Sequence, residues 1–182
     1  MKLFANLNRK KYLRRLLMGV LVFLVAMAQN VPWLPSILGA RAWPLLPLVV
    51  AVAVCDQPVP AIVFGAFAGV LWDFSSPSHG LHAIYLAFIA FACAMLLRYI
   101  LNRNAFTVAL LSFLSIAIYL LLRWFGEYAT LPNLSPAALA RPLWRSALPS
   151  LAYTMLLTPI LYALVHQIVR KTSRRQRGVL AE

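Results

Sequence analysis

The chain has 182 residues, of which 63% are hydrophobic and 12% are charged, with a formal net charge of +13 and a mean hydropathy of +0.80. Soluble domains are about 45–50% apolar and about 25% charged, so this composition excludes a soluble globular protein. A membrane span needs about 20 apolar residues, so the length allows about six spans and no separate soluble domain. We therefore predict an all-α polytopic membrane protein.

The positive charge lies largely at the two ends of the chain, which argues against nucleic-acid binding. Six basic residues precede the first apolar run, namely Lys2, Arg9, Lys10, Lys11, Arg14 and Arg15. Five follow the last one, namely Arg170, Lys171, Arg174, Arg175 and Arg177. Charges that flank spans set membrane orientation and attract anionic headgroups. We expect basic tails at 1–15 and 170–182 around a six-helix domain at 16–169, with the lipid bilayer and no nucleic acid as a partner.

The predicted spans cover, in chain order, about residues 16–29, 43–55, 58–72, 81–101, 105–122 and 146–169. The first resembles a signal peptide, but we favour an uncleaved signal-anchor because cleavage would strand the basic C-terminus on the wrong side. The second and third are short, so they either lie in thinner bilayer or pack mainly on protein. Pro149 and Pro159 predict a kink in the sixth.

Two connecting segments are expected at the membrane surface. Residues 31–42 hold two prolines, a tryptophan and Arg41, and residues 123–145 are rich in Trp, Tyr, Pro and Arg. Aromatic and basic residues of this kind anchor segments at the membrane–water interface. We therefore predict an interfacial connection at 31–42 and a surface-lying segment at 123–145.

The distribution of Lys and Arg predicts the topology. With six spans, both termini lie on the same side of the membrane. That side collects 13 of the 17 basic residues, since Arg98 and Arg103 join those of the two tails; the other side has Arg41, Arg123, Arg141 and Arg145. The positive-inside rule then places both termini in the cytoplasm and turns Asp73 outward.

Asp73 ends the third span, and its spacing is informative. Gly65, Gly69 and Asp73 recur every four residues, so they share one helix face. A carboxylate at a helix end accepts hydrogen bonds from the N–H groups and hydroxyls of the following turn, here those of Ser75, Ser76 and Ser78. The catalytic alternative is an acid–base pair of Asp73 with His79 or His82. Those three residues form only a weak candidate metal site, because they come from one loop.

The small residues of the third span allow two kinds of helix contact. Ala61, Gly65 and Gly69 form a stripe that lets another helix backbone approach closely. The neighbour is either a helix of this chain or the transmembrane helix of a partner. We favour an internal contact for Gly69, because it lies near the Asp73 turn, and have no preference for Gly65.

The remaining polar residues predict no chemistry. Cys55 and Cys93 are expected to be buried thiols without metal-ligand spacing. Ser150, Thr154 and Thr158 recur every four residues in the sixth span, where we expect bonds to backbone or to a neighbouring helix. His166 suits a helix C-terminus near the headgroups. No nucleotide-binding, metalloprotease or serine-hydrolase motif occurs, so we predict no enzymatic activity, no cofactor and no metal site.

The segment 65–98 resembles the central signature of the rod shape-determining MreD family. In that family a glycine-rich helix ends in Leu and Asp, a Ser-Pro turn and a Gly-Leu-x-Ala step follow, and the next helix ends in Arg. The matching residues are Gly65, Gly69, Leu71, Asp73, Ser76, Pro77, Gly80, Leu81, Ala83 and Arg98. The chain departs from the family at Ser78-His79, where Pro-Leu often precedes the glycine.

The resemblance implies a non-catalytic subunit of the bacterial elongation complex in the cytoplasmic membrane. Such a subunit is a scaffold that associates with MreC, and indirectly with MreB, RodA and the rod-type penicillin-binding protein, in lateral peptidoglycan synthesis and rod cell shape. The expected structural motif comprises Gly65, Gly69, Asp73, Pro77, Gly80, His82 and Arg98.

The family fold is similar to the S-components of energy-coupling-factor vitamin transporters, which supplies an alternative function. A transporter subunit would bind a small ligand in an outward cavity lined by polar or aromatic groups. The candidates for that lining are Trp33, Trp72, Asp73 and Trp124.

Overall fold

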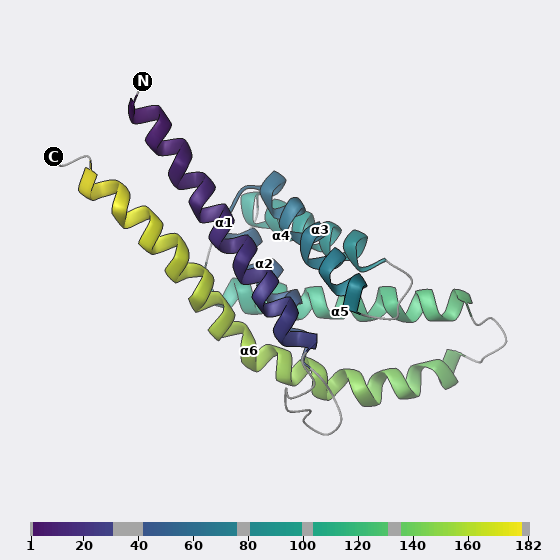
Figure 1. Ribbon diagram of the computed structural model, residues 1–182. Helices are drawn as coiled ribbons and strands as arrows, with labels where there is room; N and C mark the ends of the chain where they lie inside the picture. The colour runs from purple at the N-terminus through teal and green to yellow at the C-terminus, as the bar shows by residue number, and fades with distance from the viewer. Residues whose placement is uncertain (1, 31–41, 76–80, 100–103, 131–135, 180–182) are drawn as a thin grey trace.

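The computed structural model describes residues 2–30, 42–75, 81–99, 104–130 and 136–179. Side chains are described over 12–30, 42–75, 81–99, 104–122, 125 and 147–172. Over these residues the chain forms helices and no strand (Figure 1): α1 Lys2–Asn30, α2 Leu45–Cys55, α3 Pro58–Ser75, α4 His82–Tyr99, α5 Ala105–Thr130 and α6 Pro136–Val179. The predicted all-α fold class is confirmed.

Five of these six described helices contain a stretch long and apolar enough to cross a membrane. The stretches are Tyr12–Asn30, Pro58–Ser75, His82–Tyr99, Ala105–Leu122 and Ala147–Thr172. The remaining helix, α2, has 11 residues, which at 1.5 Å per residue is about 16 Å and about half of the hydrocarbon thickness. The protein is therefore a polytopic membrane protein, and its described residues form five long helices and one short apolar helix.

The short helix α2 lies at the centre of the bundle. Every residue from Leu45 to Val54 is buried, and each of the other five helices contacts it. A helix enclosed on all sides is apolar around its whole circumference, which explains why its sequence shows no polar face. The sequence left two explanations for the short second span, a thinner bilayer or packing mainly on protein. The burial of α2 confirms packing on protein.

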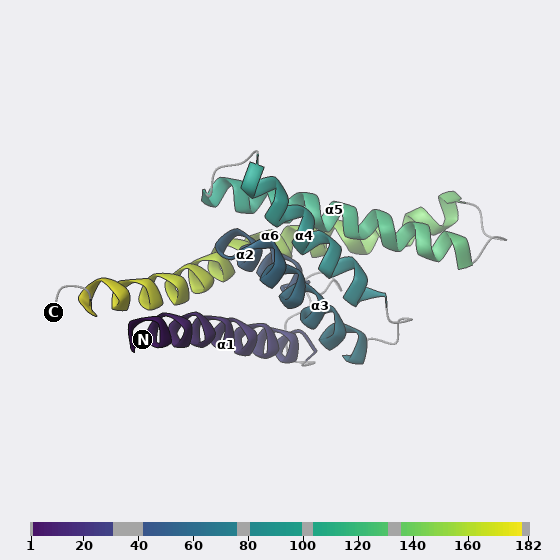
Figure 2. The same ribbon diagram turned by 90° about the horizontal axis from the view of Figure 1, so that it is seen from above.

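The two terminal helices run alongside one another. Contacts join α1 and α6, and the N-terminal end of α1 lies at the same end of the molecule as the C-terminal end of α6 (Figures 1 and 2). Figure 1 also shows that α6 changes direction part-way along. The interior prolines Pro149 and Pro159 supply the physical reason, because each removes a backbone donor and crowds the preceding turn.

The segment at 123–145, predicted to lie at the membrane surface, falls between the apolar stretches Ala105–Leu122 and Ala147–Thr172, and much of it is helical. α5 continues to Thr130 and α6 begins at Pro136, so both helices run past the ends predicted for their spans. Aromatic and basic residues are compatible with helices that extend beyond the apolar core, so the composition of this segment did not reveal its helical structure. The basic ends are helical too, over residues 2–15 and 170–179.

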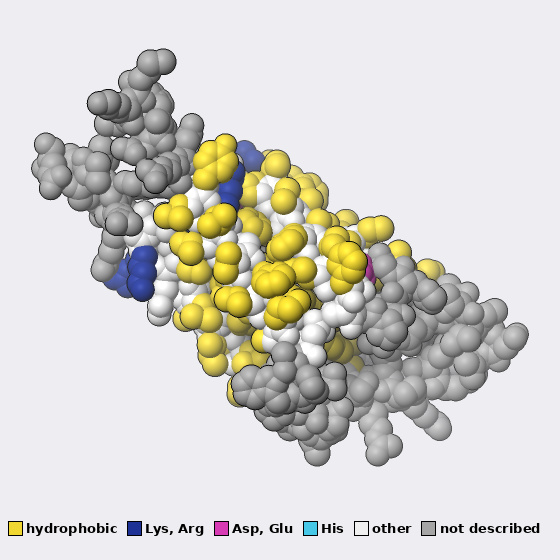
Figure 3. All heavy atoms as spheres, in the orientation of Figure 1, with side chains coloured by type: hydrophobic (Ala, Val, Ile, Leu, Met, Phe, Trp, Pro, Cys, Tyr) yellow, Lys and Arg dark blue, Asp and Glu magenta, His cyan; other side chains and the backbone are white. Residues whose placement is uncertain are grey.

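Hydrophobic side chains cover the outside of the bundle. Figure 3 shows them across the middle of the visible face, with the basic side chains displaced toward the end where the chain termini lie. Many large apolar side chains are exposed, among them Phe74, Val59 and Phe106 at 86%, 72% and 79%. Such a surface is stable only where lipid replaces water.

Candidate functional site

The two glycines of α3 lie directly against the backbone of α4. A Cβ on Gly65 would lie 2.5 Å from the carbonyl oxygen of Leu86, and one on Gly69 would lie 2.5 Å from that of His82 and collide with the backbone of Ala83. Both helices can approach this closely only because neither glycine has a side chain at the contact. The stripe therefore makes an internal contact at Gly69, as favoured from the sequence, and also at Gly65.

Asp73 continues the same helix face and caps α4. Its Oδ1 accepts a hydrogen bond from the backbone N–H of His82 at 3.2 Å, and its Oδ2 accepts one from that of Ala83 at 3.1 Å. The first N–H groups of a helix have no partner within the helix, and a carboxylate at this position satisfies them and favours the positive end of the helix dipole. Asp73 is thus an N-cap supplied by the preceding helix.

Of the three serine hydroxyls predicted to bind Asp73, only that of Ser75 lies within the described residues, and it bonds elsewhere. Ser75 donates instead to the backbone carbonyls of Leu71 and Trp72, both at 3.0 Å. Serine on the last turn of a helix readily bonds back to that turn, which the expectation overlooked. Ser76, Pro77, Ser78, His79 and Gly80 lie outside the described residues.

His82 extends the Asp73 contact into the bundle. Its Nδ1 lies 2.7 Å from Asp73 Oδ1 and its Nε2 lies 2.9 Å from the Tyr119 hydroxyl of α5. An ionised carboxylate only accepts hydrogen bonds, so Nδ1–H donates to Asp73, and in a neutral ring Nε2 accepts from Tyr119. Asp73, His82 and Tyr119 therefore join α3, α4 and α5 in one hydrogen-bonded chain.

Aromatic rings enclose that chain. Trp72 stacks on the His82 ring with centroids 4.9 Å apart and on Tyr119 at 5.4 Å, and Trp43 meets Tyr119 edge-on at 5.7 Å. The backbone N–H of Trp43 donates to Thr154 Oγ1 of α6 at 3.0 Å. Buried polar networks are stable only when their members are paired, and the rings cover much of this one, leaving the His82 and Asp73 side chains 11% and 16% exposed.

A second carboxylate lies at the opposite end of α3. Asp56, between α2 and α3, has a side chain only 2% exposed, and its Oδ1 accepts a hydrogen bond from Arg14 of α1 at 3.0 Å. Arg15 Nε lies 3.9 Å from Oδ2, which is too long for a hydrogen bond. No local sequence pattern links residues 42 positions apart, so this pairing could not be predicted from the sequence.

The hydroxyl residues of α6 bond to its own backbone. Thr154 donates to the Ser150 carbonyl at 2.6 Å, and Thr158 donates to the Thr154 carbonyl at 3.0 Å. This confirms the expected backbone bonding, and Trp43 adds a bond from outside the helix. His166 is exposed and its ring lies 5.8 Å from that of Tyr162.

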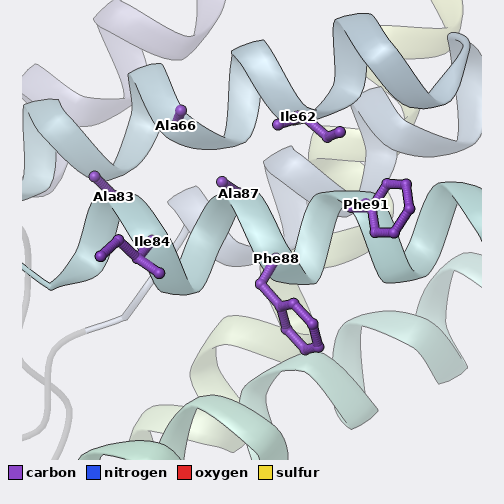
Figure 4. Close-up of a pocket in the computed structure, with 7 residues that line it drawn as sticks. All are labelled: Ile62, Ala66, Ala83, Ile84, Ala87, Phe88 and Phe91. Atoms are coloured by element: carbon purple, nitrogen blue, oxygen red, sulfur yellow. The ribbon is translucent and has the colours of Figure 1, made fainter.

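A groove of about 460 Å³ lies between α3 and α4 on the outside of the bundle. Figure 4 shows its lining: Ile62 and Ala66 from α3, with Ala83, Ile84, Ala87, Phe88 and Phe91 from α4. All seven side chains are apolar. This lining can contact hydrocarbon chains or apolar side chains, but it does not supply the polar groups that orient a small polar ligand.

The other predicted site residues are distributed as follows. Arg98 is exposed in the last turn of α4, with its guanidinium 5.7 Å from the centre of the Tyr99 ring. The side chains of Trp33 and Trp124 lie outside the described part of the chain. Within the described residues, no group of three His, Cys, Asp or Glu side chains is placed to hold a metal ion.

The comparison with protein families decides the assignment. The family model for the rod shape-determining protein MreD matches residues 10–171. The chain belongs to the MreD family. Comparisons with curated proteins and with solved structures gave no match, so the similarity to transporter S-components stays a prediction.

The MreD signature can now be explained by contacts. Its α3 residues Gly65, Gly69 and Asp73 all contact α4, and the alanine of its Gly-Leu-x-Ala step, Ala83, lies against Gly69 and donates its N–H to Asp73. Sequence reasoning missed Tyr119, whose only signal was an aromatic hydroxyl near the end of an apolar run. These signature residues thus form the packing contact and the helix cap that hold α3 against α4.

Proposed function

We propose that this chain acts as a non-catalytic scaffold of the rod-shape complex. In this role it holds an MreC-type membrane protein beside the machinery of lateral peptidoglycan synthesis, with indirect links to MreB, RodA and the rod-type penicillin-binding protein. The observation that carries the proposal is the MreD family match over residues 10–171. The location is the bacterial inner membrane, with both termini in the cytoplasm.

The described chemistry supports a scaffold. The His and Asp of the α3–α4 hairpin are used to cap a helix and to join it to α5. Catalysis needs a nucleophile or base directed at a space where a substrate can bind. Asp73 is directed at backbone N–H groups and His82 at Asp73 and Tyr119, so this cluster serves to fix helices relative to one another.

The same contacts weigh against the transporter alternative. Trp72 and Asp73, two of the four residues proposed to line a ligand cavity, contact His82 and Tyr119 inside the bundle. A preformed ligand site would need these groups directed into open space. Their packing inside the protein favours a rigid structural hairpin.

Replacement of the native MreD in a rod-shaped bacterium tests the proposal. Cells depleted of their own MreD should keep rod shape when they produce this chain, and an MreC-type protein should co-purify with it in mild detergent. Round cells despite normal accumulation of the chain, together with no recovery of an MreC-type protein, would contradict the proposed role.

A substitution in the α3–α4 contact tests whether the role depends on this hairpin. Gly69→Leu should open the α3–α4 contact, so both cell shape and partner recovery should fall. Gly19→Ala is the matched control, because the nearest atom to an added Cβ there is a Phe64 ring carbon at 3.8 Å. Equal loss with both variants would show that partner recovery does not depend on the hairpin.

A further inference from the structure

The recess between α3 and α4 is open to the outside of the bundle. Figure 4 shows its residues on facing turns of the two helices. Ala66, Ala83 and Ala87 are half-buried and form its floor, whereas Ile84 and Phe88 are 64% and 60% exposed beside it. We name the seven lining residues the α3–α4 groove: Ile62, Ala66, Ala83, Ile84, Ala87, Phe88 and Phe91.

The α4 side of the groove has the spacing of a helix–helix seam. Ile84, Phe88 and Phe91 lie four and three residues apart, and Met95 and Arg98 continue the same alternation. Residues spaced in this way share one helix face, and the side chains of a second helix insert between them. This face of α4 therefore has the pattern with which helices pack in pairs.

The small residues of the groove distinguish it from the neighbouring surface of α3. That surface carries exposed bulky side chains, namely Val59, Val63, Phe67, Val70 and Phe74. The groove instead has alanine at three of its seven positions. Small residues let another helix backbone approach closely, and helix association in lipid depends on such packing. A fluid acyl chain contacts any apolar surface and needs no recess, so the groove fits a transmembrane helix better than a lipid.

Charge at the end of the seam argues against a second copy of this chain as the occupant. Arg98 is exposed on the same face as Phe91. Two copies paired through this face in one membrane would hold both Arg98 side chains at the same depth, and like charges placed together oppose association. Asp56 and Asp73, the acidic residues whose side chains are described, are already bonded within the protein. The seam therefore suits a helix of a different protein.

We propose that the α3–α4 groove is the docking surface for a transmembrane helix of an MreC-type partner. This inference rests on the proposed scaffold function, since the family match is what points to a partner of that type. Large apolar side chains of the partner helix fit over the three alanines of the floor. The exposed side chains of α4 then contact that helix at the four-and-three spacing expected for a helix in a groove.

Filling the groove tests the proposal. Ala66→Leu with Ala87→Leu adds bulk over the floor without adding polarity, so recovery of the MreC-type protein in mild detergent should fall on the order of tenfold. The matched control, Ala152→Leu with Ala163→Leu, makes the same change at two exposed alanines of α6 and should leave recovery unchanged. Both double variants should accumulate normally and keep the native melting temperature, because none of the four alanines is fully buried.

Photocrosslinking in cells is a second measurement, and it leaves the groove open. With p-benzoylphenylalanine in place of Phe88, the chain should crosslink to the transmembrane segment of the MreC-type protein. The same replacement at Phe113, which is exposed on α5, should give no such crosslink. A crosslink from position 88 to a second copy of this chain, or equal crosslinking from both positions, would overturn the proposal.

The outcomes separate the groove from the scaffold function. If the native chain recovers the MreC-type protein and sustains rod shape, but filling the groove changes neither, the scaffold function stands and the groove is not the docking surface. If the native chain recovers no MreC-type protein, the scaffold function itself is contradicted, and the docking proposal fails with it.

Discussion

Gly65 and Gly69 set the distance between α3 and α4. At both positions the atom nearest to an added Cβ belongs to the backbone of α4, which cannot move aside as a flexible side chain can. In lipid, helix association depends on packing and hydrogen bonds because water no longer drives apolar surfaces together. Close backbone contact at these two points therefore contributes a large share of the stability of the hairpin.

Replacement of these glycines by alanine tests that role. Gly65→Ala and Gly69→Ala should each destabilise the protein by about 1–3 kcal/mol, since an added Cβ forces the backbones apart. Gly19→Ala should be neutral or slightly stabilising, because its Cβ would meet Phe64 at an ordinary distance of 3.8 Å. Thermal unfolding of the purified variants measures the differences. Equal melting temperatures for all three would show that the hairpin tolerates wider spacing.

Asp73 gives a second prediction at this scale. Asp73→Asn keeps an oxygen that accepts from His82 or Ala83 and should be mild, whereas Asp73→Leu should cost on the order of 1–3 kcal/mol by leaving backbone donors unpaired. Unfolding temperature and accumulation in the membrane are the measurements. If Asp73→Asn abolished rod-shape activity while accumulation and partner recovery stayed normal, the ionised carboxylate itself would be needed.

At the scale of elements, an ion pair joins the N-terminal half of α1 to the α2–α3 junction. The described side chains of α1 are largely exposed, but Met18, Val22 and Ala26 are buried and Arg14 reaches Asp56 at the α2–α3 junction. Asp56 also accepts a hydrogen bond from the Gln57 N–H at 2.9 Å. The pair thus links the first helix to the start of the central hairpin.

Substitution of the two arginines separately tests this link. Arg14→Gln should destabilise the protein by about 1–2 kcal/mol, less than a fully buried pair because its side chain is 25% exposed. Arg15→Gln is the control and should have a smaller effect, because Arg15 lies 3.9 Å from the carboxylate. Chemical unfolding compares the two. A larger loss of stability with Arg15→Gln than with Arg14→Gln would show that Arg15, not Arg14, makes the main contact with Asp56.

At the scale of the whole molecule, the orientation proposed from the basic residues leads to a labelling experiment. In a variant without Cys55 and Cys93, single cysteines are introduced as Ser78→Cys, in the turn after α3, and as Lys171→Cys, at the end of α6. An impermeant thiol reagent should label the first in intact cells and the second only after lysis. The reverse pattern would place the termini outside.

The sequence by itself determined the class of the protein and the order of its helices. Length and composition require several membrane spans, and the four-residue spacing of Gly65, Gly69 and Asp73 is enough to place them on one face. The family resemblance rests on the same residues. These inferences succeeded because they depend on local periodicity and on the cost of polar groups in lipid.

The tertiary structure alone decided which groups meet. Asp73 bonds to His82 and Ala83 across a turn, and His82 bonds to Tyr119 on a helix 37 residues away. Arg14 and Asp56 pair over 42 residues, and α2 is buried because five helices surround it. Such contacts depend on how helices pack, and helix periodicity specifies the face of a residue but not the neighbour that the face will contact.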